Sequence, residues 1–575
     1  MSIPDDLLQR AKAWQADDPD PDTRAEVDRL IAERDQAALA DRFRGALEFG
    51  TAGLRGLLGA GPNRMNRKVV LRATAGLCAY LLDTTPDARE RGICIGFDGR
   101  RLSTELARDA ASVACGMGIR VFAFEHVVPT PLVGFACLEK NAAAGIVVTA
   151  SHNPPDYNGY KVYWGNGAQI IPPIDAGIAA AIERVGPVDT IARASALDAS
   201  LYEVLGADVE RRYLDGVRAL ALHPELPRTL SIAYTAMHGV GARLATQALA
   251  EAGFNAVFSV KEQEEPDGRF PTVAFPNPEE AGAMDLVIAL AKEKQADLVF
   301  ANDPDADRLA VAARDRDGEY VQLTGNDVGC LLGHYLLDQG PREGRRAVVN
   351  TIVSSPMLGA IARAHGASSE QVLTGFKWIA NRAIALEAEG ARFVLGYEEA
   401  LGYTVGALVR DKDGIGTAVV VADLAAWSAS KGRTLLEELE EAWRRYGMYL
   451  SRQVAKVLPG AEGAQQIAAI MERVRSAPPA AIADRKVTAF VDLTRDERRT
   501  ADGRVEPTGL PPGDVIALEL EGDHRVMLRP SGTEPKIKFY FDVRVDIAPG
   551  EAIDAARARG QALIGELVAG LERVT

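Results

Sequence analysis

The feature that most constrains the fold is a regular alternation of short apolar runs with helix-like runs, which starts at about residue 66. RKVVLRATAGLCAYLL precedes the apolar run GICIGFD, and LARDAASVACGMG separates that run from VFAFE and AAAGIVVTA. The apolar residues of the two longer segments have helical spacing. The same rhythm returns in LSIAYTAMHGVG with ARLATQALAEAG, in ADLVFAND and in AVVNTIVSSPMLGAIARAHG. A βαβ rhythm of this kind predicts mixed or parallel sheets covered by helices.

The last part of the chain has a different pattern. After about residue 450, KVTAFVDL, DVIALELEG, HRVMLRPSG and KIKFYFDVRV follow one another before a final amphipathic run. Strands dominate this segment, which indicates a separate α+β domain. We therefore predict three related α/β domains, with mixed sheets covered by helices, and a smaller C-terminal α+β domain. The expected boundaries are 1–207, 208–324, 325–450 and 451–575.

Composition excludes several classes of protein. Apolar residues make up 47% of the chain and charged residues 25%, which is typical of a globular protein and excludes disorder and collagen. The formal net charge of -15 argues against nucleic acid or an anionic membrane as a partner. Because the N-terminus has two early aspartates and the chain lacks an apolar run of about 18 residues, we expect a cytoplasmic protein. The scattered cysteines show no CxxC spacing and are expected to be buried thiols: Cys78, Cys94, Cys115, Cys137 and Cys330.

A serine loop follows the apolar run GIVVTA. Ser151 and His152 begin a segment with two prolines and a glycine that leads to Lys161. A serine at the carboxyl end of a strand, on a stiff loop, can act as a nucleophile, although an ordinary turn hydroxyl is the simpler interpretation. A hydrolase elbow needs glycine two residues before and after the serine, and this chain has Thr149 and Asn153 there. That class is disfavoured.

An acidic loop follows the apolar run ADLVF and presents carboxylates at alternate positions, Asp303, Asp305 and Asp307. Such a set suits a hard cation, and Mg²⁺ usually takes a few carboxylates together with phosphate oxygens or water. An EF-hand is excluded because its sixth and twelfth positions require glycine and glutamate, where this chain has Arg308 and Arg314. A solvated acidic turn is the simpler alternative, but the repulsion between close carboxylates favours a bound cation.

Two further segments carry weaker signals. Glu398 and Glu399 lie in GYEEALGY after the run RFVLG, and their carboxylates can accept hydrogen bonds from sugar hydroxyls. For this segment alone, a charged turn is the favoured interpretation. Upstream, Thr374, Gly375 and Lys377 place an ammonium group beside a glycine turn, which is not diagnostic alone.

The fourth loop, RPSGTEPK, lies between two predicted strands. Arg529, Ser531, Gly532 and Thr533 bring together a guanidinium group, two hydroxyls and a flexible backbone amide. These groups can surround a phosphate dianion, because arginine binds two oxygens in a fork and the other donors bind the rest. A plain turn is the alternative for this loop alone.

Together these segments resemble the α-D-phosphohexomutase superfamily, most closely its phosphoglucomutase and phosphopentomutase branch. TASHNP with NGYK, DPDADR, GYEEALGY and RPSGTEPKIK occur in this order over nearly the whole chain. FGTAGLRG resembles the substrate-facing N-terminal loop, with Arg55 in the arginine position. The resemblance implies four domains around a central cleft and a Mg²⁺-dependent mutase that interconverts glucose 1-phosphate and glucose 6-phosphate. A phosphopentomutase or a phosphomannomutase using the same site is the alternative.

The resemblance also implies roles for the reacting groups. The serine that matches Ser151 carries a phosphoryl group, lends it to the sugar phosphate and takes back the other phosphate of the resulting bisphosphate. A sugar 1,6-bisphosphate is therefore the expected activator. Lys161 is expected to transfer a proton at the sugar hydroxyl, a role open to a lysine whose pKa falls on burial. Arg308 and Lys161 would stabilise the transition state, and His152 would support them.

The binding residues follow from the same resemblance. The aspartates of the acidic loop would hold Mg²⁺ with an oxygen of the serine phosphate, Glu398 and its neighbours would bind the sugar, and the cradle at Arg529 would bind the phosphate that is not reacting. Several relatives have serine where this chain has Ala400, which bears on the choice of sugar. The expected partner is a small phosphosugar, and the expected state is a monomer or weak dimer.

Two other functions are less consistent with the sequence. A phosphatase with Asp303 as nucleophile would release inorganic phosphate, but Asp307 stands where that class prefers a small hydroxyl residue. A phosphosugar sensor would need neither Ser151 nor Lys161. Both are therefore disfavoured.

Overall fold

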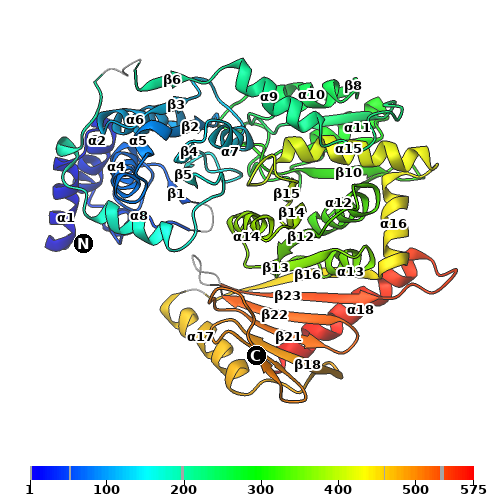
Figure 1. Ribbon diagram of the computed structural model, residues 1–575. Coiled ribbons are helices and arrows are strands. Elements are labelled where there is room, and N and C mark those ends of the chain that lie inside the picture. Colours follow the sequence, from blue (N-terminus) through cyan, green and yellow to red (C-terminus); the bar gives the residue numbers. More distant parts are fainter. Residues whose placement is uncertain (1–2, 51–52, 196–199, 459, 531–535) are drawn as a thin grey trace. The chain divides into compact units, whose positions relative to one another are not determined.

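The structure, a computed structural model, describes residues 3–50, 53–195, 200–458, 460–530 and 536–575 (Figure 1). It contains two compact units. One is formed by residues 1–325 and 375–434, and the other by residues 326–374 and 435–575. Among the described residues, no helix is both long enough and apolar enough to cross a membrane.

Three short helices open the first unit, α1 (Asp5–Ala16), α2 (Pro21–Ala32) and α3 (Gln36–Arg42). Carboxylates cap two of them, because Asp20 accepts from an amide of α2 and Asp35 from an amide of α3. The apolar faces of the three helices form a small core of their own. The alternation of strands and helices that begins at about residue 66 did not predict this element.

The first sheet has the strand order β1-β5-β4-β2-β3-β6. Strands β4, β2, β3 and the edge strand β6 are parallel, while β5 is antiparallel to both β4 and β1. Helices α6 and α7 pack on β2 and β4, and α4 packs against α6 and α8 (Figure 1). The elements are β1 (Leu54–Leu57), α4 (Arg67–Thr84), α5 (Ala88–Arg91), β2 (Ile93–Phe97), α6 (Ser103–Gly116), β3 (Val121–Ala123), α7 (Thr130–Glu139), β4 (Ala144–Val148), β5 (Tyr157–Trp164), α8 (Ile174–Glu183) and β6 (Tyr202–Val204).

The second sheet repeats this plan in the order β11-β10-β9-β7-β8. Strands β9, β7 and β8 are parallel, and β10 and β11 add an antiparallel edge. Helix α11 packs on β7 and β9, and α10 packs on β8 and α15. The elements are α9 (Ala207–Arg218), β7 (Ser231–Thr235), α10 (Ala242–Glu251), β8 (Ala256–Ser259), α11 (Asp285–Lys294), β9 (Leu298–Ala301), β10 (Ala310–Arg314) and β11 (Tyr320–Gln322).

The rest of the first unit is a helix, a hairpin and a second helix. These are α14 (Phe376–Ala388), β14 (Arg392–Glu398), β15 (Gly402–Val405) and α15 (Gly414–Ser430). Strands β14 and β15 are antiparallel. Helix α15 is buried along almost its whole length, which explains why its sequence is apolar on every side.

The second unit combines a parallel strand pair, β12 and β13, with an antiparallel sheet in the order β16-β23-β22-β21-β18-β19-β20. Helices α17 and α18 contribute apolar side chains to the core of that sheet. The elements are α12 (Gly325–Gln339), β12 (Arg346–Thr351), α13 (Met357–Ala364), β13 (Ser368–Val372), α16 (Leu435–Tyr446), β16 (Met448–Val457), α17 (Gly460–Ser476), β17 (Ala481–Ile482), β18 (Arg485–Asp492), β19 (Glu497–Thr500), β20 (Val505–Glu506), β21 (Ile516–Leu520), β22 (His524–Pro530), β23 (Lys536–Val545) and α18 (Ile553–Glu572).

The predicted fold class is confirmed in its main features. The sheets preceding the C-terminal segment are mixed or parallel and carry helices, and the C-terminal segment is rich in antiparallel strands. All five cysteines are buried thiols, as expected. The serine loop follows the carboxyl end of β4, the acidic loop follows that of β9, and a third polar loop follows that of β2. Ligands usually bind at this end of a parallel sheet.

Candidate active site

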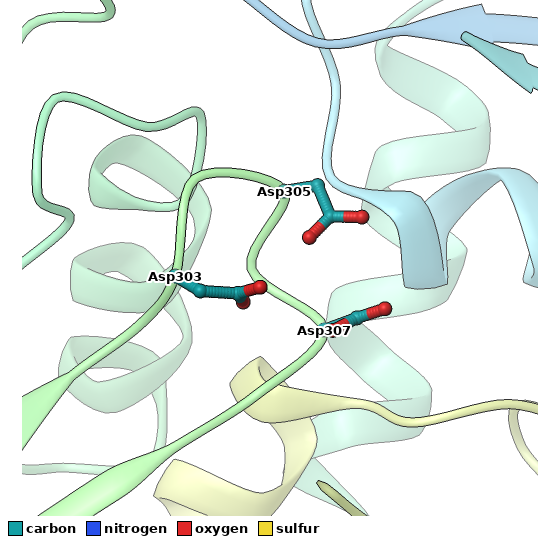
Figure 2. A group of neighbouring side chains, drawn as sticks. All are labelled: Asp303, Asp305 and Asp307. Atoms are coloured by element: carbon teal, nitrogen blue, oxygen red, sulfur yellow. The ribbon is translucent and has the colours of Figure 1, made fainter. Parts of the chain in front are cut away.

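The acidic loop after β9 gathers its three carboxylates at one point. Asp303, Asp305 and Asp307 are fully buried, and they offer oxygens that all lie within 4.8 Å of one another. Figure 2 shows the three side chains converging from one turn of the chain. The turn is closed by the amide of Ala306, which donates to the carbonyl of Asp303 at 2.8 Å. Alternate residues of the loop therefore point to a common side.

The serine loop meets this cluster directly. Ser151 follows β4, is 2% exposed, and donates from Oγ to Oδ2 of Asp303 at 2.7 Å. Its Oγ also lies 3.1 Å from Nδ1 of His152, and its amide donates to Oγ1 of Thr149 at 2.8 Å. The backbone of Ser151 has φ of +49°, a left-handed conformation that costs a non-glycine residue about 1–3 kcal/mol. Surrounding contacts must therefore hold it there.

Lys161 supplies the central positive charge from β5. Its Nζ donates to Oδ2 of Asp305 and to Oδ2 of Asp307, both at 2.8 Å. Burial opposes the ammonium form, but the two carboxylates outweigh it and raise the pKa of Lys161 above its usual value. The expectation of a lowered pKa is therefore wrong, because the lysine is buried together with two partners of opposite charge.

The aspartates differ in their ionisation. Burial, reinforced by the two neighbouring carboxylates, raises the pKa of Asp303 well above its usual range. Burial would also raise the pKa of Asp305, but the Lys161 ammonium and a hydrogen bond from Thr130 hold it well below. The same turn thus carries one carboxyl group with a raised pKa and one with a lowered pKa, an arrangement common at functional sites.

The cluster also fits a cation. Within the part of the chain that the structure describes, Oδ1 of Asp305 and Oδ1 of Asp307 are buried and have no hydrogen-bond partner. Unpaired carboxylate oxygens are costly in the interior unless a cation binds them. Asp303, Asp305 and Asp307 can therefore hold a metal ion, and carboxylate oxygens suit a hard divalent one.

More cations surround the cluster. Arg308 donates its backbone amide to Oδ1 of Asp303 at 3.0 Å, and its guanidinium lies 3.7 Å from Glu279. Arg55, on β1, donates to Oδ1 of Asn153 at 2.8 Å, and burial lowers its pKa to about 10. Burial, with help from Arg308 and Arg55, holds the pKa of His152 well below its usual range, so this imidazole is neutral.

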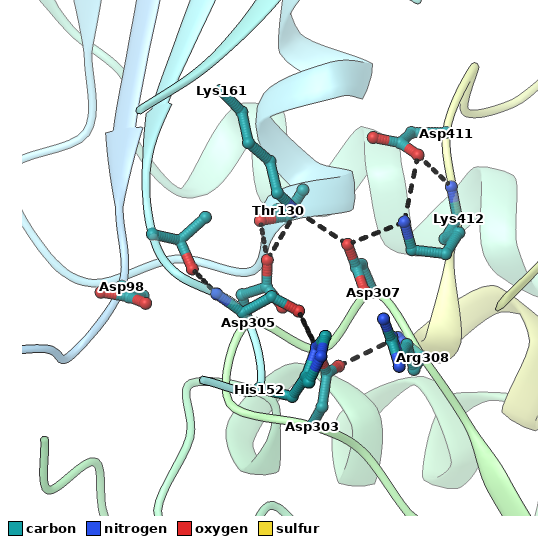
Figure 3. A network of polar contacts seen from close by, with 12 residues as sticks. Asp98, Thr130, His152, Lys161, Asp303, Asp305, Asp307, Arg308, Asp411 and Lys412 are labelled. Atoms are coloured by element: carbon teal, nitrogen blue, oxygen red, sulfur yellow. Dashed lines mark hydrogen bonds and ion pairs between the residues drawn. The ribbon is translucent and has the colours of Figure 1, made fainter. Parts of the chain in front are cut away.

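The structure adds residues that sequence reasoning missed. Lys412, in the loop between β15 and α15, lies 3.3 Å from Oδ2 of Asp307 and 3.9 Å from Oε1 of Glu398. Thr130, the first residue of α7, donates to Oδ2 of Asp305 at 2.8 Å. Figure 3 shows Lys161 and Lys412 approaching Asp307 from different elements. The sequence contains a signal for Lys412, because a charged Asp-Lys-Asp triplet precedes an apolar helix. It contains no comparable signal for Thr130.

The predicted sugar-binding residues divide into two groups. Glu398 ends β14, is buried beside Lys412, and has a pKa raised chiefly by burial, while Glu399 lies in the turn that follows. Lys377 lies 4.0 Å from Asp175 and 3.5 Å from the carbonyl of Gly50, in the segment that precedes Arg55. Gly375 precedes α14 with φ of +114°. Thr374 belongs to the second unit.

The predicted phosphate cradle is described only in part. Arg529 lies on β22, opposite Lys538 of β23, in the second unit. Ser531, Gly532 and Thr533 lie outside the described residues. The assignment of this loop to a phosphate therefore stays a prediction from the sequence.

Known proteins match this chain over most of its length. Three domains described as "Phosphoglucomutase/phosphomannomutase, alpha/beta/alpha domain" I, II and III match residues 46–188, 211–318 and 324–446. The chain is 42% identical to a protein of Haemophilus influenzae called "Probable phosphomannomutase", over 84% of this chain and 93% of that protein. It is 36% identical to the human "Phosphopentomutase", over 98% of this chain and 95% of that protein.

A solved structure shares the fold. The open form of parafusin, a phosphoglucomutase of Paramecium, superimposes with a TM-score of 0.68 over 91% of this chain and 94% of that one, at 17% identity. The fold described above is therefore shared with a solved protein.

Proposed function

Because the chain belongs to the phosphoglucomutase/phosphomannomutase family and is thus a phosphomutase, we propose that it moves a phosphoryl group between the 1- and 6-positions of a hexose. Glucose 1-phosphate and glucose 6-phosphate are the proposed pair. One observation carries the proposal: Ser151 Oγ, on a strained loop, lies 2.7 Å from an aspartate cluster that can hold a metal ion. A phosphoryl carrier beside a metal site is what reversible transfer requires.

In the proposed reaction Ser151 carries the phosphoryl group. The free hydroxyl of the sugar phosphate attacks phosphorus, the P–Oγ bond breaks, and a sugar bisphosphate forms. One proton leaves the sugar hydroxyl and one reaches Oγ. Because His152 is neutral it can accept a proton, and because Lys161 is an ammonium it can donate one. We therefore assign the first transfer to His152, whose Nδ1 lies 3.1 Å from Oγ, and the second to Lys161. The return step reverses these events on the other phosphate.

Charge must be balanced while the group moves. Lys161 already offsets Asp305 and Asp307, and Arg308 adds positive charge beside Asp303. The three aspartates would hold Mg²⁺, which withdraws charge from phosphoryl oxygens when bound. We further assign Glu398 and Glu399 to the sugar hydroxyls and the loop at Arg529 to the phosphate that is not reacting.

A pentose phosphate is the second candidate substrate. The human phosphopentomutase aligns with almost the whole chain, and Ala400 offers no hydroxyl to a hexose in the turn after Glu398. A missing hydroxyl contact weakens selection for the larger sugar.

We expect the purified protein, with Mg²⁺ and a catalytic amount of sugar bisphosphate, to convert glucose 1-phosphate to glucose 6-phosphate faster than it converts mannose, ribose or deoxyribose 1-phosphate. Initial rates measured in parallel decide the substrate. Inorganic phosphate is measured in the same samples, because a phosphatase would release it in proportion to substrate consumed. A higher rate with ribose 1-phosphate than with glucose 1-phosphate would change the assignment to a phosphopentomutase. Stoichiometric release of inorganic phosphate would exclude both mutase assignments.

Mg²⁺ should raise the melting temperature of the protein by a few degrees, because an ion that binds only the folded state stabilises it, by about 2.7 kcal/mol at a hundred times its Kd. Asp307→Asn should remove most of this shift, since it removes one of the unpaired oxygens. Asp317→Asn, an exposed turn residue, is the matched control. The shift is measured by differential scanning calorimetry with and without chelator. An undiminished shift in Asp307→Asn would place the cation elsewhere.

A further inference from the structure

A single arginine lies beneath the serine loop and binds its backbone. Arg100 follows β2 and its side chain is 1% exposed. One guanidinium nitrogen, Nη1, donates to the carbonyls of Pro154 at 2.9 Å and Tyr157 at 3.2 Å. The other, Nη2, donates to the carbonyls of Ser151 and Asn153. Three carbonyls of the serine loop and that of Tyr157, the first residue of β5, thus converge on one buried group.

The loop depends on these contacts. Between β4 and β5 its carbonyls lie outside the strand ladder, and buried carbonyls need donors. Ser151 also has φ of +49°, which persists only where neighbouring contacts enforce it. The hydrogen bond to the Ser151 carbonyl acts on the very residue whose Oγ must face Asp303.

The guanidinium is itself held from two sides. Its Nε lies 3.3 Å from Oδ2 of Asp98, and its Cζ lies 4.9 Å from the ring centroid of Phe270. Phe270 belongs to the second matched domain, whereas Arg100 and Ser151 belong to the first. Arginine commonly stacks on an aromatic face in this way while its N–H groups bind acceptors in its plane. The second domain thereby contacts the group that shapes the serine loop.

We propose that Arg100 is a positioning residue for phosphoryl transfer, which holds the Ser151 hydroxyl at Asp303 through the loop carbonyls, and that Phe270 keeps the guanidinium in place. The proposal rests on the proposed function of Ser151. It follows that a change in Arg100 should slow the chemical step and leave the binding of the sugar phosphate nearly unchanged, because none of the residues that it binds, in the serine loop or outside it, is assigned to the sugar. Lysine cannot replace it, since one ammonium cannot reach four carbonyls spread over a planar fork.

The test compares Arg100→Lys with Arg101→Lys in the complete protein. Arg101 is the neighbouring residue, and its side chain is 64% exposed, in a loose pair with Asp156. We expect Arg100→Lys to lower kcat by about 100-fold with KM changed less than about two-fold, because a small misplacement of the nucleophile has an effect of that size. Arg101→Lys should keep both constants. A kcat within two-fold of wild type in Arg100→Lys, or a change in KM alone, would overturn the proposal.

Two further variants separate positioning from folding. Phe270→Leu, which leaves Arg100 in place but removes the ring, should lower kcat about five-fold without a change in KM. If Arg100→Lys does not fold, Phe270→Leu serves as the test instead. A wild-type kcat in Phe270→Leu would then contradict the proposal. Millimolar guanidinium should restore part of the activity of Arg100→Ala, and methylammonium should not. If the wild type and Arg101→Lys fail to convert glucose 1-phosphate at all, the proposed function is wrong rather than the role of Arg100.

Discussion

Ser151→Ala is expected to lower kcat by about 10⁴-fold or more, because the phosphoryl carrier has no substitute at this position. Oγ is the atom that would bear the phosphoryl group, and it is the atom that donates to Asp303 at 2.7 Å. Mutase activity is measured with glucose 1-phosphate and catalytic bisphosphate. The intact mass of the wild type should show a fraction with one added phosphate, and the variant should show none.

The loss should not come from unfolding. Removing Oγ deletes a hydrogen bond to a carboxyl group, which is worth about 1–3 kcal/mol, and the contact with Nδ1 of His152. The backbone contacts of the loop stay in place. Ser112→Ala, on α6, is the matched control, because its hydroxyl donates to a carbonyl far from the aspartates. It should keep wild-type kcat. Near-normal mutase activity in Ser151→Ala would exclude Ser151 as the carrier.

Much of this site could be predicted from the polar residues that follow the apolar runs of the sequence. Ser151 and Asp303 each follow an apolar run, and polar residues at the carboxyl ends of parallel strands gather at one edge of a sheet. Their direct contact, across 152 positions of sequence, could not be predicted from the residues alone, because it depends on how two sheets are placed within one unit. The resemblance of the motifs supplied that link.

Other residues of the site left no pattern to find. Arg100 binds backbone carbonyls, which every loop has. The sequence therefore contains no residue pattern that predicts its role. Thr130 is the first residue of a helix, a position common for threonine, and this position alone does not indicate a role in a site. Lys161 was identified, but the direction of its pKa was not, since that depends on two carboxylates which approach it from another sheet. Charge balance in a buried cluster is a property of the folded chain.

Lys161→Met should have the second large effect, and it should affect both activity and stability. The variant leaves Asp305 buried without the ammonium that holds its pKa low, and an unpaired buried charge destabilises a protein by about 3–5 kcal/mol. Loss of proton transfer should also lower kcat by about 10²–10⁴-fold. Calorimetry and initial rates measure the two effects. Lys140→Met is the control: Lys140 pairs with Glu203 at the same close range, 2.7 Å, but Glu203 is 36% exposed, so the expected loss is under about 1 kcal/mol.

A second substitution separates charge balance from catalysis. Asp305→Asn in the Lys161→Met background removes the unpaired charge and should recover much of the lost melting temperature, because neutral side chains tolerate burial better than a broken ion pair. It should not recover kcat, since both the proton donor and a carboxylate oxygen of the cluster are then missing. Equal losses of stability in Lys140→Met and Lys161→Met would show that the aspartates are compensated by other groups. Recovery of activity in the double variant would show that Lys161 serves the fold and takes no part in the transfer.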